Sequence, residues 1–162
     1  MFRLNKLADY ALVVMEYITS HPERYPHTAR SVAEATHLPA PTVVKILKKL
    51  ADSELVISQR GAKGGYTAAR TSSMISVAEV VEAMDGPMGL TECATAPGRC
   101  ELEGRCRIEA NVRVIGRVLR QTLRNISLSD LTALLNVTTK APGHKAVLTS
   151  IAAASLTSGG MQ

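Results

Sequence analysis

The sequence predicts a mainly α-helical protein with one small β-hairpin, and three observations support this class. Apolar residues recur at helical spacing in several segments, the first of them at residues 4–20. Two short extended runs flank a glycine-rich tip at residues 61–65, which is the pattern of a hairpin. Of the 162 residues, 46% are hydrophobic, so the chain can bury a real core.

Composition also excludes several classes of protein. No apolar run reaches the ~18 residues that a membrane span needs, and the N-terminus lacks the pattern of a secretory signal. We therefore expect a cytoplasmic protein without a membrane partner. Aromatic residues make up only 3%, which argues against a stacking surface for single-stranded nucleic acid. Three cysteines, an odd number, favour reactive or metal-binding thiols over a disulfide framework.

The first predicted helix spans residues 4–20 and has one apolar face. The residues of that face follow the spacing of an amphipathic helix: Leu4, Leu7, Ala8, Ala11, Leu12, Met15 and Ile18. Prolines within residues 21–26 end this helix. Thr28 is suited to be the N-cap of a short second helix, whose inward residues are Val32, Ala33 and Leu38.

The third predicted helix runs from about Pro41 to Ser53, after a tight turn at residues 37–41. Proline suits the first position of a helix. The apolar stripe consists of Val43, Ile46, Leu47 and Leu50, and the lysines lie off that stripe. Two short helices joined by a tight turn, the second basic on its free face, predict a helix-turn-helix.

The hairpin follows directly, formed by residues 55–60 and 66–70, and in this place it is a wing. Its glycines let the tip approach a groove closely, while Arg60 and Lys63 bring positive charge. Residues 41–70 carry an excess of Lys and Arg in a chain of net charge +5. Such a block predicts a surface that faces a polyanion, although charge alone would fit a solvated helix face equally well.

A fourth predicted helix spans Ser76–Met84, because Ser76 and Glu79 form a capping box and Gly86 ends it. A loop follows, and then a long helix from about Arg107 to Asn125. Its apolar residues recur at spacings close to a coiled-coil seam: Ile108, Val112, Ile115, Leu119, Leu123 and Ile126. We interpret this helix as a dimerisation element, with packing against its own domain as the alternative.

A second stripe of this helix holds Arg113, Arg117, Arg120 and Arg124, which we expect to be solvated or paired with acids. A short helix starting near Ser127 follows, and after it the chain is rich in small residues. The predicted organisation is therefore a winged helix-turn-helix domain, a cysteine loop, dimerisation helices and a flexible tail, at residues 1–85, 86–106, 107–135 and 136–162.

The cysteine loop, residues 86–106, contains Cys93, Cys100 and Cys106, separated by six and five residues. This spacing is too open for a zinc finger or ribbon, and no His lies nearby in the sequence. Three thiolates on a bending loop can converge on one centre, and such soft ligands suit an iron–sulfur cluster as well as zinc. Inert thiols are the third interpretation of the same residues.

Five segments together resemble a known family: LNKLADYALVVMEYI, LPAPTVVKILKKL, LVISQRGAKGGY, ISVAEVVEAMDGP, and LTEC with its two following cysteines. Over about residues 1–135 the chain resembles the iron–sulfur-cluster winged-helix transcriptional regulators (IscR/NsrR-like). It is most similar to the Suf-system regulators of cluster assembly, whose cysteine loop has the same spacing.

The resemblance implies that Cys93, Cys100 and Cys106 hold an iron–sulfur cluster with two or four irons. In nitric-oxide-sensing relatives the fourth ligand is an acid of the first helix, donated by the other subunit, and Asp9 occupies that position here. In the Isc-type branch it is a His three residues after the third cysteine, where this chain has Glu109. We favour Asp9, with Glu109 as the alternative.

The resemblance also implies a DNA-binding surface on the two helices and the wing: Thr28, Thr42, Lys45, Lys48, Lys49, Arg60, Lys63 and Tyr66. The lysines are expected to contact phosphates, and Thr42 and Arg60 to contact bases. Tyr66 has a second interpretation as part of the core of the wing. In some relatives an acidic residue in the middle of the recognition helix rejects certain operators. This chain has Val44 at that position.

These observations predict a homodimer that binds double-stranded operator DNA and represses iron–sulfur cluster assembly genes of the Suf or Isc type. Two alternatives stay open: a redox- or nitric-oxide-sensing repressor of stress genes, and a DNA-binding module whose thiols hold zinc or are inert. An enzyme is not expected, because the sequence shows no constellation of base and nucleophile.

Overall fold

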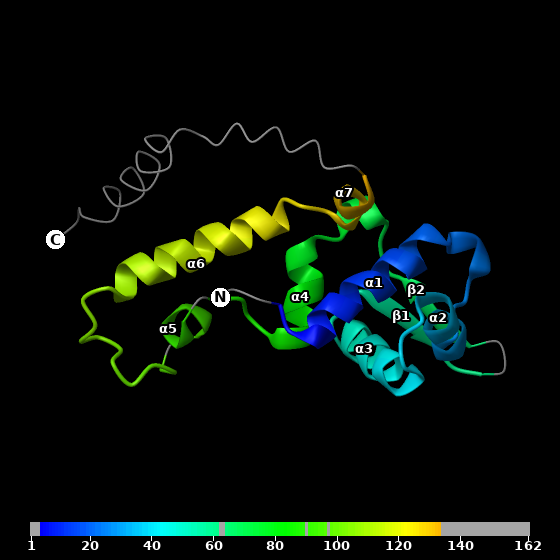
Figure 1. Cartoon of the computed structure of the whole chain (residues 1–162), viewed down its shortest axis with the longest axis horizontal. Coiled ribbons are helices and arrows are strands. Elements are labelled where there is room, and N and C mark those ends of the chain that lie inside the picture. The colour runs from blue at the N-terminus through cyan, green and yellow to red at the C-terminus, as the bar shows by residue number, and fades with distance from the viewer. Residues whose placement is uncertain (1–3, 62–63, 90, 97, 134–162) are drawn as a thin grey trace.

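The computed structural model describes residues 4–61, 64–89, 91–96 and 98–133. Its helices and strands (Figure 1) are, in order, α1 (Lys6–Ser20), α2 (Ala29–Thr36), α3 (Ala40–Asp52), β1 (Val56–Gln59), β2 (Gly65–Ala68), α4 (Val77–Asp85), α5 (Glu92–Thr95), α6 (Glu109–Arg124) and α7 (Leu128–Thr132). Two 3-10 turns, η1 (Pro22–Arg24) and η2 (Ser72–Met74), complete the elements. The predicted class, mainly helical with one antiparallel hairpin, is confirmed.

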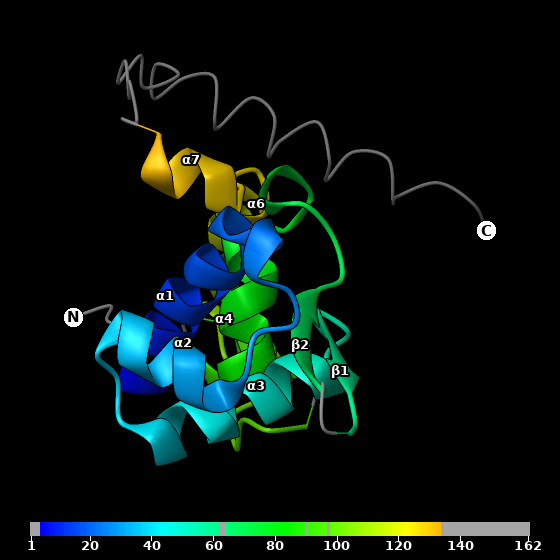
Figure 2. The ribbon, with the colours of Figure 1, turned by 90° about the vertical axis from the view of Figure 1, so that its right-hand side faces the viewer.

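Helix α1 forms the centre of the winged domain, in contact with α2, α3 and α4 (Figure 2). Its N-cap is Asn5, whose side chain accepts hydrogen bonds from the N–H groups of Leu7 and Ala8. Four residues of the predicted apolar face are fully or nearly fully buried, namely Ala8, Ala11, Met15 and Ile18, and Val14 is buried beside them. The other three predicted residues, Leu4, Leu7 and Leu12, are half-buried and pack against the core. This face provides the largest share of any helix to the hydrophobic core.

The helix-turn-helix consists of α2 and α3. Thr28 is the N-cap that the sequence predicts, since its hydroxyl accepts the N–H of Ser31 at 3.0 Å. His37 ends α2 in the left-handed region, with a φ of 55°, and Pro41 lies within the first turn of α3. The predicted stripe of α3 is completely buried: Val43, Ile46, Leu47 and Leu50.

The wing pairs β1 with β2 in antiparallel register, from Val56 opposite Ala68 to Gln59 opposite Gly65. Two backbone hydrogen bonds tie it to the segment before α2, from His27 N–H to Tyr66 O at 3.0 Å and from Tyr66 N–H to His27 O at 2.8 Å. A Cβ at Gly65 would lie 2.6 Å from the His27 carbonyl oxygen, so this approach requires glycine.

Helix α4 begins with the predicted capping box of Ser76 and Glu79 and ends at Gly86. An isolated bridge joins Ser76 to Ser127, so that the chain returns from α6 to the winged domain. Leu128 of α7 is 1% exposed and belongs to the same buried cluster as α1 and α4. Figure 1 shows α6 extending from α4 toward the cysteine loop, away from α2, α3 and the hairpin.

The structure corrects two predictions, the extent of the cysteine loop and the start of the long helix. The segment 86–106 is not a loop throughout, because Glu92–Thr95 form the short helix α5, which no helical periodicity could reveal over four residues. The long helix begins at Glu109, two residues later than predicted. The predicted flexible tail, residues 136–162, lies outside the described residues. No helix of the described part of the chain has the length and apolar character needed to cross a membrane.

Candidate nucleic-acid interface and cysteine loop

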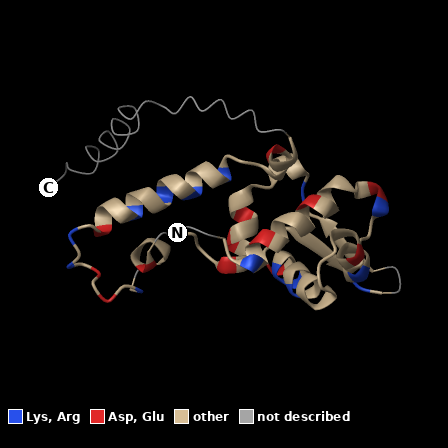
Figure 3. Cartoon of the chain, viewed as in Figure 1, with Lys and Arg blue, Asp and Glu red and all other residues tan. Residues whose placement is uncertain are grey.

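The face of α3 opposite its buried stripe carries Val44, Lys45 and Lys48, all exposed, with Thr42 half-buried beside them. Figure 3 shows the basic residues along this helix. Val44 is 49% exposed, so an aliphatic side chain stands on the free face of the predicted recognition helix. The structure therefore brings three of the predicted DNA contacts, Thr42, Lys45 and Lys48, together on one surface.

Lys49 is placed differently from its two neighbouring lysines. It is half-buried, and its ammonium group donates a hydrogen bond to the carbonyl oxygen of Met84 at 2.5 Å. Met84 lies in the last turn of α4, where unpaired carbonyl groups attract a positive charge. Lys49 thus joins α3 to the end of α4 within the winged domain. Because donor and acceptor are 35 residues apart, no local sequence pattern predicts this hydrogen bond.

On the wing, Arg60 is exposed next to the end of β1, and Lys63 lies outside the described residues. Tyr66 is half-buried, packs against the core cluster and forms the backbone bridge to His27. This placement supports the interpretation of Tyr66 as part of the core of the wing. Thr28 is exposed at the start of α2, with its hydroxyl already bonded to the Ser31 N–H.

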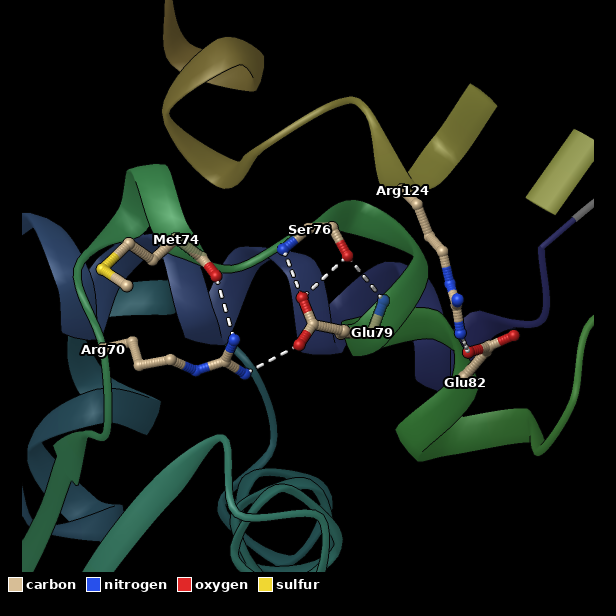
Figure 4. Close-up of polar contacts among 6 residues, drawn as sticks. All are labelled: Arg70, Met74, Ser76, Glu79, Glu82 and Arg124. Atoms are coloured by element: carbon tan, nitrogen blue, oxygen red, sulfur yellow. Dashed lines mark hydrogen bonds and ion pairs between the residues drawn. The ribbon is translucent and has the colours of Figure 1, made fainter. Parts of the chain in front are cut away.

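The segment that leaves the wing is held by a polar cluster at the start of α4 (Figure 4), in which the contacts of Arg70 add to the predicted capping box and were not themselves predicted. Arg70 forms an ion pair with Glu79 at 2.8 Å and donates to the carbonyl oxygen of Met74 at 3.0 Å. Glu79 also accepts the backbone N–H and the hydroxyl of Ser76, both at 2.8 Å. Partial burial opposes ionisation, but the hydrogen bonds from Ser76 and Arg70 lower the pKa of Glu79 overall.

One turn further along α4, Glu82 connects this helix to α6. Its carboxylate lies 2.7 Å from Arg120 Nε. It also lies 3.6 Å from Arg124 Nη2, as Figure 4 shows. Arg113 pairs with Glu103 and Glu109 in the same way, at 2.6 and 2.9 Å. The predicted pairing of the arginine stripe with acids is therefore confirmed for Arg113, Arg120 and Arg124.

Part of the apolar face of α6 is uncovered in the single chain, whereas Leu123 and Ile126 near its C-terminal end pack against the core of the winged domain. Ile108, just before the helix, is 62% exposed, Ile115 is 53% exposed and Val118 is 46% exposed. Gly116 is the only buried residue among those of α6. A row of aliphatic side chains in this state is typical of a surface that another protein covers.

The three cysteines are all free thiols. Cys93, on α5, is 8% exposed and its sulfur lies 3.1 Å from the hydroxyl of Thr91. Cys100 and Cys106 are half-buried. Within the described part of the chain, no three His, Cys, Asp or Glu side chains lie close enough together to hold a metal ion. The three thiols fit an iron–sulfur cluster or zinc by the chemistry of their donor atoms, although the single chain does not bring them to one point.

The two candidates for a fourth ligand differ in their surroundings. Asp9 is exposed in the first turn of α1. The Glu109 carboxylate already has two partners, Arg113 at 2.9 Å and the Gly104 N–H at 2.9 Å. The spacing of Glu109 and Arg113 by four residues on a helix is the one sequence signal that could have predicted this pairing.

The fold agrees with comparisons to known proteins. The Rrf2 family, described as iron-dependent transcriptional regulators, matches residues 4–134. The chain belongs to this family. Members of the Rrf2 family are DNA-binding regulators of transcription rather than enzymes. The predicted resemblance to IscR-like regulators is confirmed at the level of the family.

Two curated relatives illustrate the similarity in sequence. The HTH-type transcriptional regulator IscR of Xenorhabdus nematophila is 30% identical over 129 residues, which cover 80% of this chain and 78% of the relative. The IscR of Escherichia coli O9:H4 is 28% identical over 152 residues, covering 92% and 93%.

Two solved structures illustrate the similarity in fold. CymR, the global cysteine regulator of B. subtilis, superimposes with a TM-score of 0.62 at 23% identity, over 81% of this chain and 96% of CymR. IscR of T. potens superimposes with a TM-score of 0.60 at 22% identity, over 81% and 86%. At such low sequence identities, the two solved structures support the fold of this chain and not its function.

Proposed function

We propose that this Rrf2-family protein is a homodimeric repressor of iron–sulfur cluster assembly genes of the Suf or Isc type, and that its DNA binding depends on an iron–sulfur cluster. The observation that carries the proposal is the placement of three free thiols on one short segment directly before α6. This helix is in turn joined by ion pairs to α4 of the winged domain.

In this proposal α3 enters the major groove of the operator and the wing lies along the adjacent groove. Lys45 and Lys48 contact phosphates, since their ammonium groups stand on the free face of α3. Thr42 and Arg60 contact bases, because the first is near the start of α3 and the second is exposed beside the wing tip. Phosphate contacts supply affinity, and the base contacts supply the choice of operator.

The dimer forms through the uncovered apolar face of α6. Exposed isoleucine and valine side chains on a helix of 16 residues would be covered by the same face of a second copy. The arginines of α6 do not oppose this packing, because three of them are neutralised by acids of their own chain. Two copies then present two recognition helices to the two halves of a pseudo-palindromic operator.

Cys93, Cys100 and Cys106 are the residues that would hold the cluster, with Asp9 of a second copy as the favoured fourth ligand. When bound, a cluster supplies an iron- and oxidant-sensitive centre to the protein. The chain's own part is to order the cysteine loop at the start of α6. A coupling free energy of about 1–3 kcal/mol between loop and operator would change DNA affinity about 5- to 150-fold.

A second candidate is a regulator whose thiols respond to oxidants without a cluster. The separation of the three cysteines in the single chain and the partial exposure of Cys100 and Cys106 favour this function. In both candidates the same surface of α3 and the wing contacts DNA.

The experiment that separates them is anaerobic purification followed by iron and labile-sulfide analysis and operator binding. Our proposal expects a brown protein with iron and sulfide, whose affinity for its operator changes after chelation at one fixed salt concentration. A colourless protein without iron, with the same affinity before and after chelation, contradicts it.

A further inference from the structure

The short helix that carries Cys93 packs unusually closely on α6. A Cβ at Gly116 would lie 3.3 Å from the Cβ of Ala94, the residue after Cys93. This separation is shorter than an ordinary van der Waals contact between carbon atoms. Gly116 is therefore the position at which α6 leaves room for α5, and α5 and α6 are in contact in the fold.

A second glycine covers α5 from another direction. A Cβ at Gly89 would lie 2.8 Å from the carbonyl carbon of Ala94 and from Cγ2 of Thr95. The Cα of Gly89 is also 4.0 Å from the Cβ position of Gly116. Helix α5 thus lies against two glycines, and Cys93 is the only buried side chain among the described residues of 89–108.

The other end of the cysteine loop is held by α6 through charge. Arg113 reaches Glu103 and Glu109, which lie on either side of Cys106. Glu103 also accepts the N–H of Gly98, and Glu109 accepts the N–H of Gly104. One guanidinium group on α6 therefore joins two carboxylates that each hold a backbone N–H of the loop. We name these contacts the Arg113 bridge.

We propose that α6 positions the cysteine loop by two independent contacts: Gly116 and Gly89 set the depth of Cys93, and the Arg113 bridge holds the segment between Cys100 and Cys106. Gly116 and Arg113 are positioning residues, since they act through the cysteines. The inference deepens the proposed function, and rests on it only for what the loop binds.

The two contacts predict a pattern that general loss of stability would not produce. In Gly116→Val the larger side chain displaces α5, while valine keeps α6 at least as helical as glycine does. In Arg113→Gln the bridge is lost, while the glycine contact stays. Arg117→Gln is the matched control, because Arg117 is exposed four residues later on the same helix and has no ion pair within the described residues.

The test measures the rate of iodoacetamide alkylation of each cysteine, by peptide mass spectrometry, in the full-length iron-free protein. Gly116→Val is expected to raise the rate at Cys93 about tenfold, since a buried thiol reacts only when its cover opens. Arg113→Gln is expected to raise the rates at Cys100 and Cys106 about threefold, because the bridge is partly exposed to solvent. Arg117→Gln is expected to leave all three rates unchanged.

A compensating pair of substitutions tests the contact itself. Gly116→Ala alone forces one methyl group against Ala94, and Ala94→Gly removes the atom that it meets. The double variant is expected to bring Cys93 reactivity back to the level of Ala94→Gly alone. The inference is overturned if each cysteine reacts in every variant at the same rate as in the unsubstituted protein. It is also overturned if a substitution raises the rates at all three cysteines by the same factor. Iron content of the unsubstituted protein tests the proposed function separately.

Discussion

The winged domain and the cysteine loop are held together by different forces. The winged domain has a continuous hydrophobic cluster to which α1, α2, α3, α4, the hairpin and α7 all contribute. The cysteine loop has only two buried side chains among the described residues of 86–106, Met88 and Cys93, of which Met88 belongs to the hydrophobic cluster. It otherwise depends on ion pairs and backbone hydrogen bonds. The winged domain, which carries the proposed DNA contacts, is therefore the stiffer part, whereas the thiol-bearing segment can rearrange at low cost.

Such a division suits a regulator whose signal arrives at the loop. Rearranging the loop breaks few buried contacts. The free energy of binding a ligand to the loop can therefore drive this rearrangement. Helix α6 belongs to both regions: Arg113 and Gly116 contact the loop, while Arg120 and Arg124 contact Glu82 of the winged domain.

The largest expected difference between the regions concerns stability. Leu47→Ala, at a completely buried position of α3, is expected to lower the free energy of unfolding by about 2–5 kcal/mol. Cys100→Ala is expected to abolish iron binding and yet leave a folded dimer, because Cys100 is only half-buried. Urea unfolding and iron analysis measure the two effects. Equal destabilisation by both substitutions would remove the contrast between the regions.

The next effect concerns operator binding by the stiff region. Arg60→Ala is expected to weaken binding by about 1–3 kcal/mol and to relax the preference at one base pair, if the guanidinium group contacts a base. Fluorescence anisotropy with the operator and a scrambled duplex measures both quantities at fixed salt. A variant that keeps the full operator preference would exclude Arg60 from base contact.

Two neighbouring lysines provide a matched pair within α3. Lys48→Met is expected to weaken binding to all DNA sequences and to reduce the salt slope by about 1, as loss of a phosphate contact does. Lys49→Met is expected instead to cost about 0.5–1.5 kcal/mol of stability, because it removes the hydrogen bond to Met84. The result that contradicts the structure is a larger loss of DNA binding for Lys49→Met than for Lys48→Met.

The smallest effect is a pH dependence of the winged domain. Burial lowers the pKa of His27, which is 2% exposed and faces His21, Glu23 and Arg24. Above its unfolded pKa, about 6.5, the imidazole is neutral in both states and contributes nothing. Below this pKa the unfolded chain binds the proton more readily than the folded chain does. The free energy of unfolding therefore decreases as the pH is lowered, by at most about 1.4 kcal/mol per pH unit.

Urea unfolding between pH 7.5 and 5.0 measures this slope. His27→Phe is expected to remove it, since the replacement does not titrate. Glu79 and Asp130 contribute little to the slope above about pH 5: hydrogen bonds lower the pKa of each in the folded state, so their own effect begins only near their unfolded pKa values of about 4. An unchanged slope in His27→Phe would assign the pH dependence to other groups.

The local features of the fold could be predicted from the sequence because their causes are local. The capping box of Ser76 and Glu79, the N-cap Thr28 and the stripe from Val43 to Leu50 depend on residues three or four positions apart. The cysteine spacing and the arginine stripe are equally local patterns. Helix α5 was not predicted because four residues are too few to show the helical periodicity of apolar residues.

By itself, then, the sequence determined the winged helix-turn-helix, the order of its elements and the set of thiols on one segment. Only the tertiary structure decided that Lys49 turns to Met84, that Arg70 holds Glu79, and that Ala94 lies on Gly116. The reason is physical: these contacts join residues from 9 to 35 positions apart, beyond the three- or four-residue spacing of a helical pattern, and each exists only after the packing of the elements has brought its two partners together.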